Sequence, residues 1–275
     1  MINSTNLKIN TDGELCYITF PSFEKTGILR HAFSTRLGGV STGMYSTMNL
    51  SFSNGDNLSS VKENFMRICN TIGVDFRKCV VSKQTHTVNL RVVDESDVGK
   101  GVTRDRDYDD VDGLITNIPG VVLVTQFADC VPLLFCDPIN KVIAASHAGW
   151  RGTVGKIGAL TVQKMHDVFG SNPQDIIVGI APSIMQCCFE VDEPVYKEFC
   201  NLETVNTEDI CEHKDNNKYN IDLQKTNKII LENAGIKPEN ITVTDLCTKC
   251  HADVFHSHRA TGGKRGNLAA FISLV

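Results

Sequence analysis

The stretch FADCVPLLFCDPINKVIAASHAGWRG, residues 127–152, decides the fold. It holds two apolar runs, Val131–Cys136 and Val142–Ala145, separated by Asp137-Pro138-Ile139-Asn140. Proline and asparagine are turn residues, so the pattern predicts two strands joined by a tight turn. Because an antiparallel hairpin folds back on itself, the residues just outside the two runs are expected at the same end of the sheet.

Reactive side chains stand at both outer ends of this hairpin. Asp129 and Cys130 precede the first run, and His147 follows the second. A thiol beside an imidazole is either a cysteine nucleophile with its base or a pair of metal ligands. A buried cysteine near a structural histidine is the simpler interpretation. The loop-like segment 148–153 favours a functional site, but the pair alone does not choose between nucleophile and metal ligands.

Composition limits the class of protein. The 275 residues are 41% hydrophobic and 21% charged, which are ordinary globular values. A net charge of −5 and a pI of about 5.9 indicate no general affinity for nucleic acid or anionic membranes. No run approaches the roughly 18 apolar residues of a membrane span. The sequence contains no repeat or linker, so we expect a single domain over residues 1–275.

The cysteines and the N-terminal residues indicate a cytoplasmic protein. The sequence has eleven cysteines, and its first residues show no basic region followed by an apolar one. No signal peptide is therefore predicted. We expect free thiols in a reducing compartment rather than a disulfide framework.

The remaining pattern predicts an α+β fold. Helices are expected from a cap at Ser59 or Ser60 to residue 72, and over residues 153–169, 193 onward and 223–234. Ile157, Leu160, Met165 and Val168 are expected on the inward face of the 153–169 helix. Further strands are expected at residues 15–20, 28–34, 79–81, 88–93, 176–180, 241–244 and 268–274. Because strands and helices do not alternate regularly, mixed sheets covered by helices fit better than a doubly wound parallel sheet.

Two polar residues between apolar segments are candidate site residues. His86 lies in a polar break between two short predicted strands, and a lone histidine of this kind is often structural. Asp112 ends the acidic segment 103–113, directly before the next predicted strand. That segment lacks the spacing of a calcium-binding loop, so it is most simply a solvated loop.

Two arginines are candidates for anion binding. Arg36 stands beside Gly38 and Gly39 in a predicted loop, and Arg151 stands at the start of the predicted 153–169 helix. Guanidinium groups and free backbone N–H groups can together receive an anion such as phosphate. Solvated arginine loops are also common, so neither position is specific by itself.

A cysteine motif near the C-terminus allows a second metal site. The segment Cys247-Thr248-Lys249-Cys250-His251 has the spacing of c-type haem attachment, which requires an exported protein. Structural zinc would instead require Cys247 and Cys250 with two histidines from His251, His256 and His258, an unusually short interval. The adjacent pair Cys187-Cys188 does not have the spacing of a chelating pair.

Taken together, the motifs resemble the YfiH family, and the resemblance spans nearly the whole chain. Its members have been called laccase-domain proteins, multicopper polyphenol oxidoreductases and purine nucleoside phosphorylases. The resemblance is carried by residues 34–41 (STRLGGVS), 84–86 (QTH), 112–116 (DGLIT), 128–132 (ADCVP), 147–152 (HAGWRG), 188–191 (CFEV) and 255–259 (FHSHR).

The resemblance implies mixed β-sheets packed face to face with helices outside, and one zinc ion held by His86, Cys130 and His147. Two imidazoles and one thiolate would leave the fourth zinc position open, as in catalytic sites. The implied reactions are phosphate-dependent cleavage of adenosine, inosine and S-methyl-5'-thioadenosine, and deamination of adenosine. Arg36 and Arg151 would then be candidate phosphate holders.

The two aspartates near these ligands have less specific implied roles. Asp129 and Asp112 are candidates for proton transfer or for orienting the metal ligands. Copper is disfavoured as the metal, because multicopper oxidases need many paired histidines. This chain has eight histidines, of which only His256 and His258 are paired in that way.

A metal-free cysteine hydrolase is the alternative enzyme. The family's fold resembles the catalytic domain of the cytotoxic necrotising factor toxins, which use a Cys–His pair. Cys130 and His147 would form such a dyad, in a role linked to cell-wall maintenance, and a dyad would not require His86. A non-enzymatic binding protein is a third hypothesis, which the gathering of reactive residues around one hairpin end disfavours.

Overall fold

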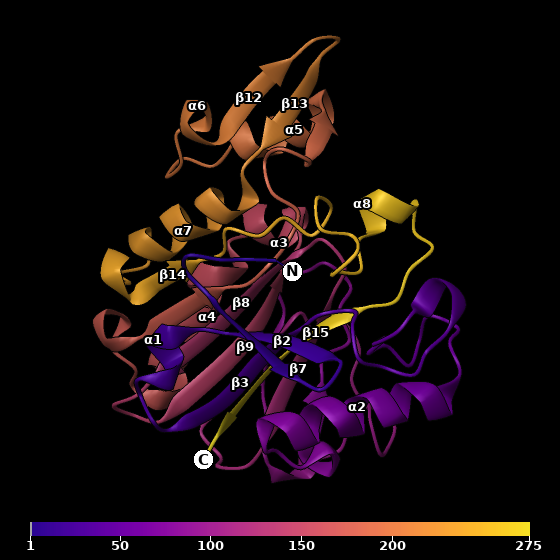
Figure 1. The fold of residues 1–275 in the computed structure, drawn as a ribbon. Helices are drawn as coiled ribbons and strands as arrows, with labels where there is room; N and C mark the ends of the chain where they lie inside the picture. The colour runs from indigo at the N-terminus through magenta and orange to yellow at the C-terminus, as the bar shows by residue number, and fades with distance from the viewer. Residues whose placement is uncertain (1) are drawn as a thin grey trace.

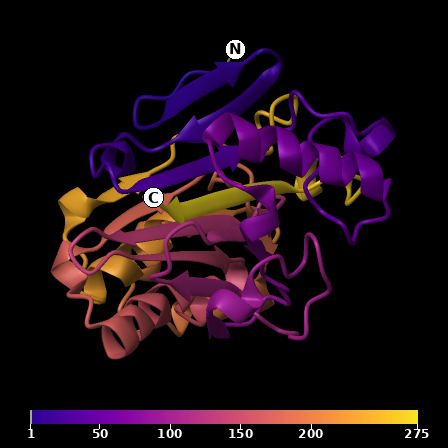
Figure 2. The same cartoon turned by 90° about the horizontal axis from the view of Figure 1, so that it is seen from below.

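Two six-stranded mixed sheets lie face to face at the centre of the computed structural model, which describes residues 2–275 (Figures 1 and 2). The first sheet contains, in spatial order, β1 (Lys8–Asp12), β2 (Leu15–Thr19), β3 (Leu29–Ser34), β15 (Leu268–Leu274), β7 (Val122–Phe127) and β4 (Cys79–Val81). The second contains β14 (Ile241–Val243), β10 (Ile177–Ile180), β8 (Val131–Asp137), β9 (Val142–Ala148), β6 (Gly113–Thr116) and β5 (Leu90–Val92).

Strands at the centre of the sheets are apolar on both faces because each face meets a different core. In β8, Leu134 and Cys136 join the core between the two sheets, whereas Leu133 and Phe135 point to the core under the helices. In β15, Leu268, Ala270 and Ile272 join the same core between the two sheets. This alternation follows from the two-residue period of a strand. It explains why the sequence shows continuous apolar runs at these strands.

Helices cover the outer faces of both sheets. The long helix α2 (Leu58–Ile72) packs on the first sheet, and α4 (Ile157–Phe169) and α7 (Leu223–Asn233) pack on the second. In Figure 2 the purple α2 and the salmon α4 lie on opposite sides of the stacked strands. The predicted α+β class, with sheets face to face and helices outside, is confirmed.

Other short helical segments are α1 (Pro21–Glu24), α3 (Trp150–Val154), α8 (His258–Thr261) and the 3₁₀ turns Gly43–Tyr45, Phe76–Lys78, Glu95–Asp97, Pro173–Asp175 and Pro238–Asn240.

Helix boundaries differ from the sequence prediction in two places. The N-cap of α2 is Asn57, whose side chain accepts from the N–H groups of Ser59 and Ser60, so the predicted serine cap is wrong. The predicted helix over residues 153–169 is two helices, α3 and α4, because Gly155 ends the first and Lys156 adopts a left-handed φ of 58°. Leu160 and Val168, predicted to face inward, are exposed.

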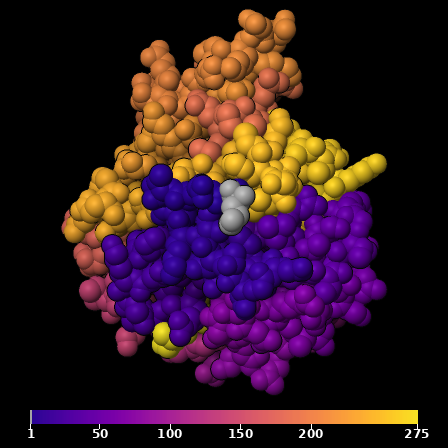
Figure 3. Space-filling model, viewed as in Figure 1, coloured from indigo at the N-terminus to yellow at the C-terminus, as the bar shows by residue number. Residues whose placement is uncertain are grey.

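A small three-stranded sheet projects from one end of the molecule (Figure 3). It is formed by β11 (Glu190–Asp192), β13 (Lys218–Ile221) and β12 (Cys211–Lys214), with α5 (Glu193–Cys200) and α6 (Thr207–Ile210) beside it. No sequence pattern indicated this sheet. Its first strand follows directly on the loop that carries Cys187, Cys188 and Phe189.

The two large sheets share one core between them. The single domain expected over residues 1–275 stays a prediction. Within residues 2–275, no helix has the length and apolar character needed to cross a bilayer.

Candidate metal centre and active site

Three side chains from separate segments of the chain form the candidate metal centre. Cys130 lies in the short link between β7 and β8, His147 lies near the end of β9, and His86 lies in the loop after β4. The hairpin register pairs Val131 with Ala148, so Cys130 and His147 lie at the same end, as predicted. One ligand atom from each of the three residues lies within 4.8 Å of the others, and Cys130 Sγ is 3.9 Å from His86 Nε2.

A zinc ion fits this set of donors. Tetrahedral zinc with Zn–N near 2.0 Å and Zn–S near 2.3 Å requires these ligand atoms to lie roughly 3.3–3.5 Å apart. The 3.9 Å between Cys130 Sγ and His86 Nε2 is a few tenths of an ångström longer, and the set contains two nitrogens and one sulfur. Gly149 allows the three side chains to lie this close together. A Cβ at that position would lie 3.0 Å from His86 Cδ2 and 3.2 Å from Cys130 Sγ, and would crowd both side chains.

Asp112 contacts both histidines, His147 through its ring and His86 through its backbone. Its carboxylate accepts a hydrogen bond from His147 Nδ1 at 2.8 Å and from the His86 backbone N–H at 3.1 Å. The backbone N–H groups of Thr85 and Thr87 donate to its other oxygen, each at 3.0 Å. With Nδ1 of His147 committed to the carboxylate, Nε2 is the nitrogen left for a metal.

The charges of the site favour a carboxylate and a thiolate. Burial alone would raise the pKa of Asp112, but the hydrogen bonds from His147 and the loop N–H groups lower it to about 2. Burial would likewise raise the pKa of Cys130, yet His147 and His86 lower it to about 6. Burial alone would lower the pKa of His147. The negative charges of Cys130 and Asp112 and the hydrogen bonds to them raise it to about 9. The thiolate is the form of cysteine that binds metals and attacks electrophiles.

Asp129 fixes the turn that presents Cys130. Its backbone adopts a left-handed φ of 89°, and its side chain is buried. One carboxylate oxygen accepts from the Thr248 hydroxyl at 2.6 Å, and the other accepts from the Arg259 backbone N–H at 2.7 Å. Both carboxylate oxygens of Asp129 are therefore engaged by other residues of the protein, and the roles expected for it in proton transfer or orientation stay predictions.

A cavity of about 500 Å³ opens beside the three candidate ligands. Its walls include the aromatic rings of Trp150 and Phe189 and three arginines, Arg106, Arg259 and Arg265. A pocket of this size with apolar walls and a few charged groups suits a small organic substrate.

The two arginines expected to bind phosphate lie elsewhere. Arg36 donates to the backbone carbonyls of Ser46 and Ala252, and Arg151 is exposed with its guanidinium 4.2 Å over the Trp150 ring. Neither residue lines the cavity. Arg259 ends the FHSHR segment noted in the sequence, but it was given no role there. Arg106 and Arg265 were not found, since no pattern around them shows that their chain segments approach Cys130.

Comparison with known proteins identifies the family. Residues 30–275 match the family described as multi-copper polyphenol oxidoreductase laccase. The chain belongs to this laccase-domain (YfiH) family. The resemblance noted in the sequence is thereby confirmed, and the fold agrees with it: the crystal structure of the Bacillus licheniformis hypothetical protein YfiH superimposes with a TM-score of 0.92 at 31% identity, covering 97% of this chain and 99% of that one.

Relatives within the family carry enzyme names. Purine nucleoside phosphorylase YlmD of Bacillus subtilis (strain 168) is 35% identical over 246 residues, which are 88% of this chain and 87% of the relative. Adenosine deaminase RL5, from an unknown prokaryotic organism, is 33% identical over 237 residues, covering 86% of this chain and 90% of the relative. The laccase-domain chain is thus similar to enzymes over nearly its whole length.

We predict that Asp112→Asn weakens metal binding by about 10- to 100-fold, because an amide cannot accept from all the groups that the carboxylate now satisfies. Zinc affinity measured by competition with a chromophoric chelator checks this. Asp109→Asn is the matched control, since the Asp109 side chain is 75% exposed and pairs only with Lys83 at the surface. Equal zinc affinity in Asp112→Asn and wild type would contradict the role given to this carboxylate.

Proposed function

We propose that this chain is a zinc-dependent purine nucleoside phosphorylase that also deaminates adenosine. Its substrates would be adenosine, inosine and S-methyl-5'-thioadenosine, with phosphate as the second substrate. The observation that carries the proposal is a His86–Cys130–His147 group opening on a cavity with aromatic walls and three arginines. The names of the relatives, phosphorylase and deaminase, support the same pair of reactions.

Each part of the site has a task in this proposal. His86, Cys130 and His147 would hold the zinc, which would supply a Lewis acid beside the cavity. Trp150 and Phe189 offer aromatic surfaces to a purine ring. Asp112 keeps the two histidines oriented, and the closed packing around Asp129 keeps the thiolate of Cys130 beside them.

Arg265 is the residue that we assign to phosphate. It lines the cavity, and burial lowers the pKa of its guanidinium although Asp129 and Cys130 raise it. Its Nε is buried without a hydrogen-bond partner among residues 2–275, and its Nη1 donates to Asn267 Oδ1. The terminal nitrogens of the guanidinium, rather than Nε, are therefore the donors that would meet a phosphate in the cavity.

A metal-free cysteine hydrolase is the second candidate function. The lowered pKa of Cys130, beside a histidine oriented by Asp112, is the arrangement of a cysteine nucleophile with its base and orienting carboxylate. The two proposals differ in His86, whose Nε2 faces the same sulfur and has no task in the hydrolase.

We keep the cytoplasm as the proposed location. All eleven cysteines are free thiols in the structure, in agreement with a reducing compartment. The copper-oxidase activity suggested by the family description is not favoured, because the potential metal-binding groups found within residues 2–275 contain only two histidines, His86 and His147.

We predict that His86→Ala and Cys130→Ala both remove phosphate-dependent release of purine base and the zinc at this site. Turnover of inosine with and without phosphate, together with metal analysis of the same samples, checks this. His166→Ala, which alters a histidine on α4 away from the ligand group, is the control and is expected to keep both. Full phosphorolysis in His86→Ala would contradict its role as a ligand of an essential metal. Absence of phosphorolysis and of zinc in wild type would leave the hydrolase as the better candidate.

Arg265→Ala is expected to weaken phosphorolysis by about 2–3 kcal/mol, or roughly 30- to 150-fold, the scale of a lost charge-assisted contact. Adenosine deamination, which uses water, should fall much less. Arg265→Lys should restore part of the loss, because a single ammonium cannot replace a guanidinium fork. Arg151→Ala is the control, and selective loss of phosphorolysis in that variant instead would place the phosphate at Arg151.

A further inference from the structure

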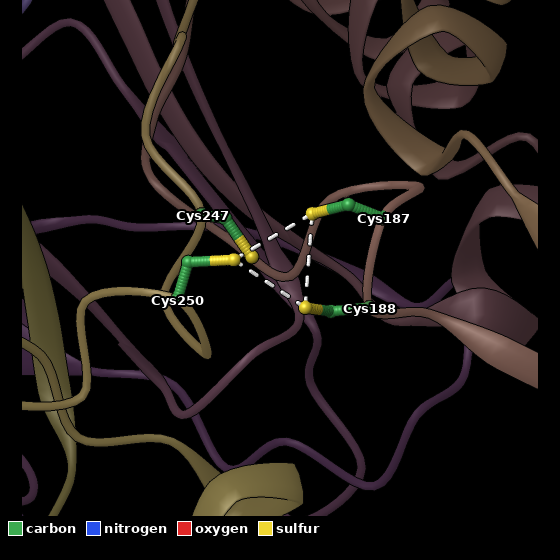
Figure 4. Close-up of side chains that lie close together, drawn as sticks. All are labelled: Cys187, Cys188, Cys247 and Cys250. Atoms are coloured by element: carbon green, nitrogen blue, oxygen red, sulfur yellow. Dashed lines mark hydrogen bonds between the residues drawn. The ribbon is translucent and has the colours of Figure 1, made fainter.

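Four cysteine sulfurs from two separate loops converge on one point (Figure 4). Cys187 and Cys188 lie in the loop between β10 and β11, and Cys247 and Cys250 lie in the turn after β14. All four sulfur atoms lie within 4.8 Å of one another. In Figure 4 the four side chains point toward a common centre from opposite sides.

The sulfur separations match a tetrahedral metal site better than a disulfide. Cys187 Sγ and Cys188 Sγ are 3.7 Å apart, and Cys250 Sγ lies 3.7 Å from the first and 3.5 Å from the second. Four sulfurs around one zinc at about 2.3 Å are separated by roughly 3.8 Å in a tetrahedron. A disulfide would require about 2.05 Å. A multi-iron cluster binds its thiolates to different irons and so spreads them farther apart, which leaves a single ion as the best fit.

The ligand set differs from the one considered in the sequence. There, Cys247 and Cys250 were expected to need two histidines, and the adjacent pair Cys187-Cys188 did not have the spacing of a chelating pair. Residues 186–188 form a turn, and in a turn two successive side chains are not forced to opposite faces as they are in a strand. No histidine belongs to the group, and His256 packs instead against Gly266.

Backbone contacts already hold the two loops in register around the sulfurs. Ser183 and Cys247 form a parallel bridge, and the Thr248 N–H donates to the Ser183 carbonyl at 3.0 Å. The Met185 N–H donates to Cys247 Sγ at 3.4 Å. N–H donors directed at sulfur stabilise the thiolate form that a metal requires.

We propose that Cys187, Cys188, Cys247 and Cys250 bind one zinc ion in a structural site separate from the His86–Cys130–His147 centre. All four positions around the metal would come from protein, which is the pattern of structural rather than catalytic zinc. This proposal goes further than the proposed enzyme function and holds whether or not that function is correct.

The position of this four-cysteine site indicates what it stabilises. Cys188 directly precedes Phe189, which lines the cavity, and Arg259 donates to the Cys188 carbonyl at 3.3 Å. Thr248, between the two C-terminal cysteines, donates to Asp129. Zinc would therefore fix one wall of the cavity to the turn that carries Cys130.

Metal analysis of the full chain, purified under reducing conditions without added metal, tests the proposal. Wild type is expected to hold about two zinc ions per chain, one for each group of ligands, and Cys188→Ser/Cys250→Ser about one. Cys200→Ser/Cys211→Ser alters two thiols outside both groups and should keep about two. Full zinc in Cys188→Ser/Cys250→Ser, or a disulfide among the four cysteines in unreduced peptide maps of freshly purified protein, would overturn the proposal.

A second measurement covers the case in which Cys188→Ser/Cys250→Ser does not fold. Cys130→Ala leaves the four cysteines intact and removes a ligand of the other centre. Loaded with cobalt(II), it should show the intense absorption of tetrahedral four-thiolate cobalt, whereas its absence would contradict the site. Loss of phosphorolysis with this signal retained would concern the His-Cys-His centre alone, so the two proposals can fail separately.

Discussion

The carboxylate of Asp112 is the group on which the candidate active site depends. It is fully buried, and it receives three consecutive backbone N–H groups of the His86 loop together with Nδ1 of His147. The loop follows β4 of the first sheet, whereas His147 belongs to β9 of the second. One charge therefore ties the two sheets together where the ligands meet. Leaving such donors unsatisfied would cost about 1–3 kcal/mol for each group.

The remaining parts of the site extend this anchoring outward. The chain crosses from the first sheet to the second between β7 and β8, and Cys130 lies in that crossing. Asp129 fixes the crossing by accepting from Thr248, in the turn after β14, and from Arg259, in α8. The four-cysteine group joins those loops to the segment carrying Phe189. The end of the β8–β9 hairpin thus meets three connecting segments: the His86 loop, the β7–β8 link and the loops that carry the four cysteines. The first two are held by the buried carboxylates of Asp112 and Asp129, and the third brings four sulfur atoms together.

Features set by neighbouring residues in the chain could be predicted from the sequence, and features set by distant contacts could not. The hairpin of β8 and β9 was predicted because its turn and apolar runs are local, and this placed Cys130 beside His147. The spacing of residues in the sequence could not show that the His86 loop lies beside Cys130 and His147. Only the resemblance to the family predicted that third ligand. The approach of the Cys188 sulfur to that of Cys250 and the approach of Arg265 to the cavity both arise from tertiary packing.

Reconstitution of metal-free protein tests the central claim most directly. Phosphorolysis of inosine would be followed while zinc is titrated into chelator-treated wild type, with Cys130→Ala as the blank for zinc bound elsewhere. Activity is expected to be absent without metal and to rise in proportion to the zinc that wild type binds in excess of the blank. Full phosphorolysis by protein shown to contain no metal would contradict the account.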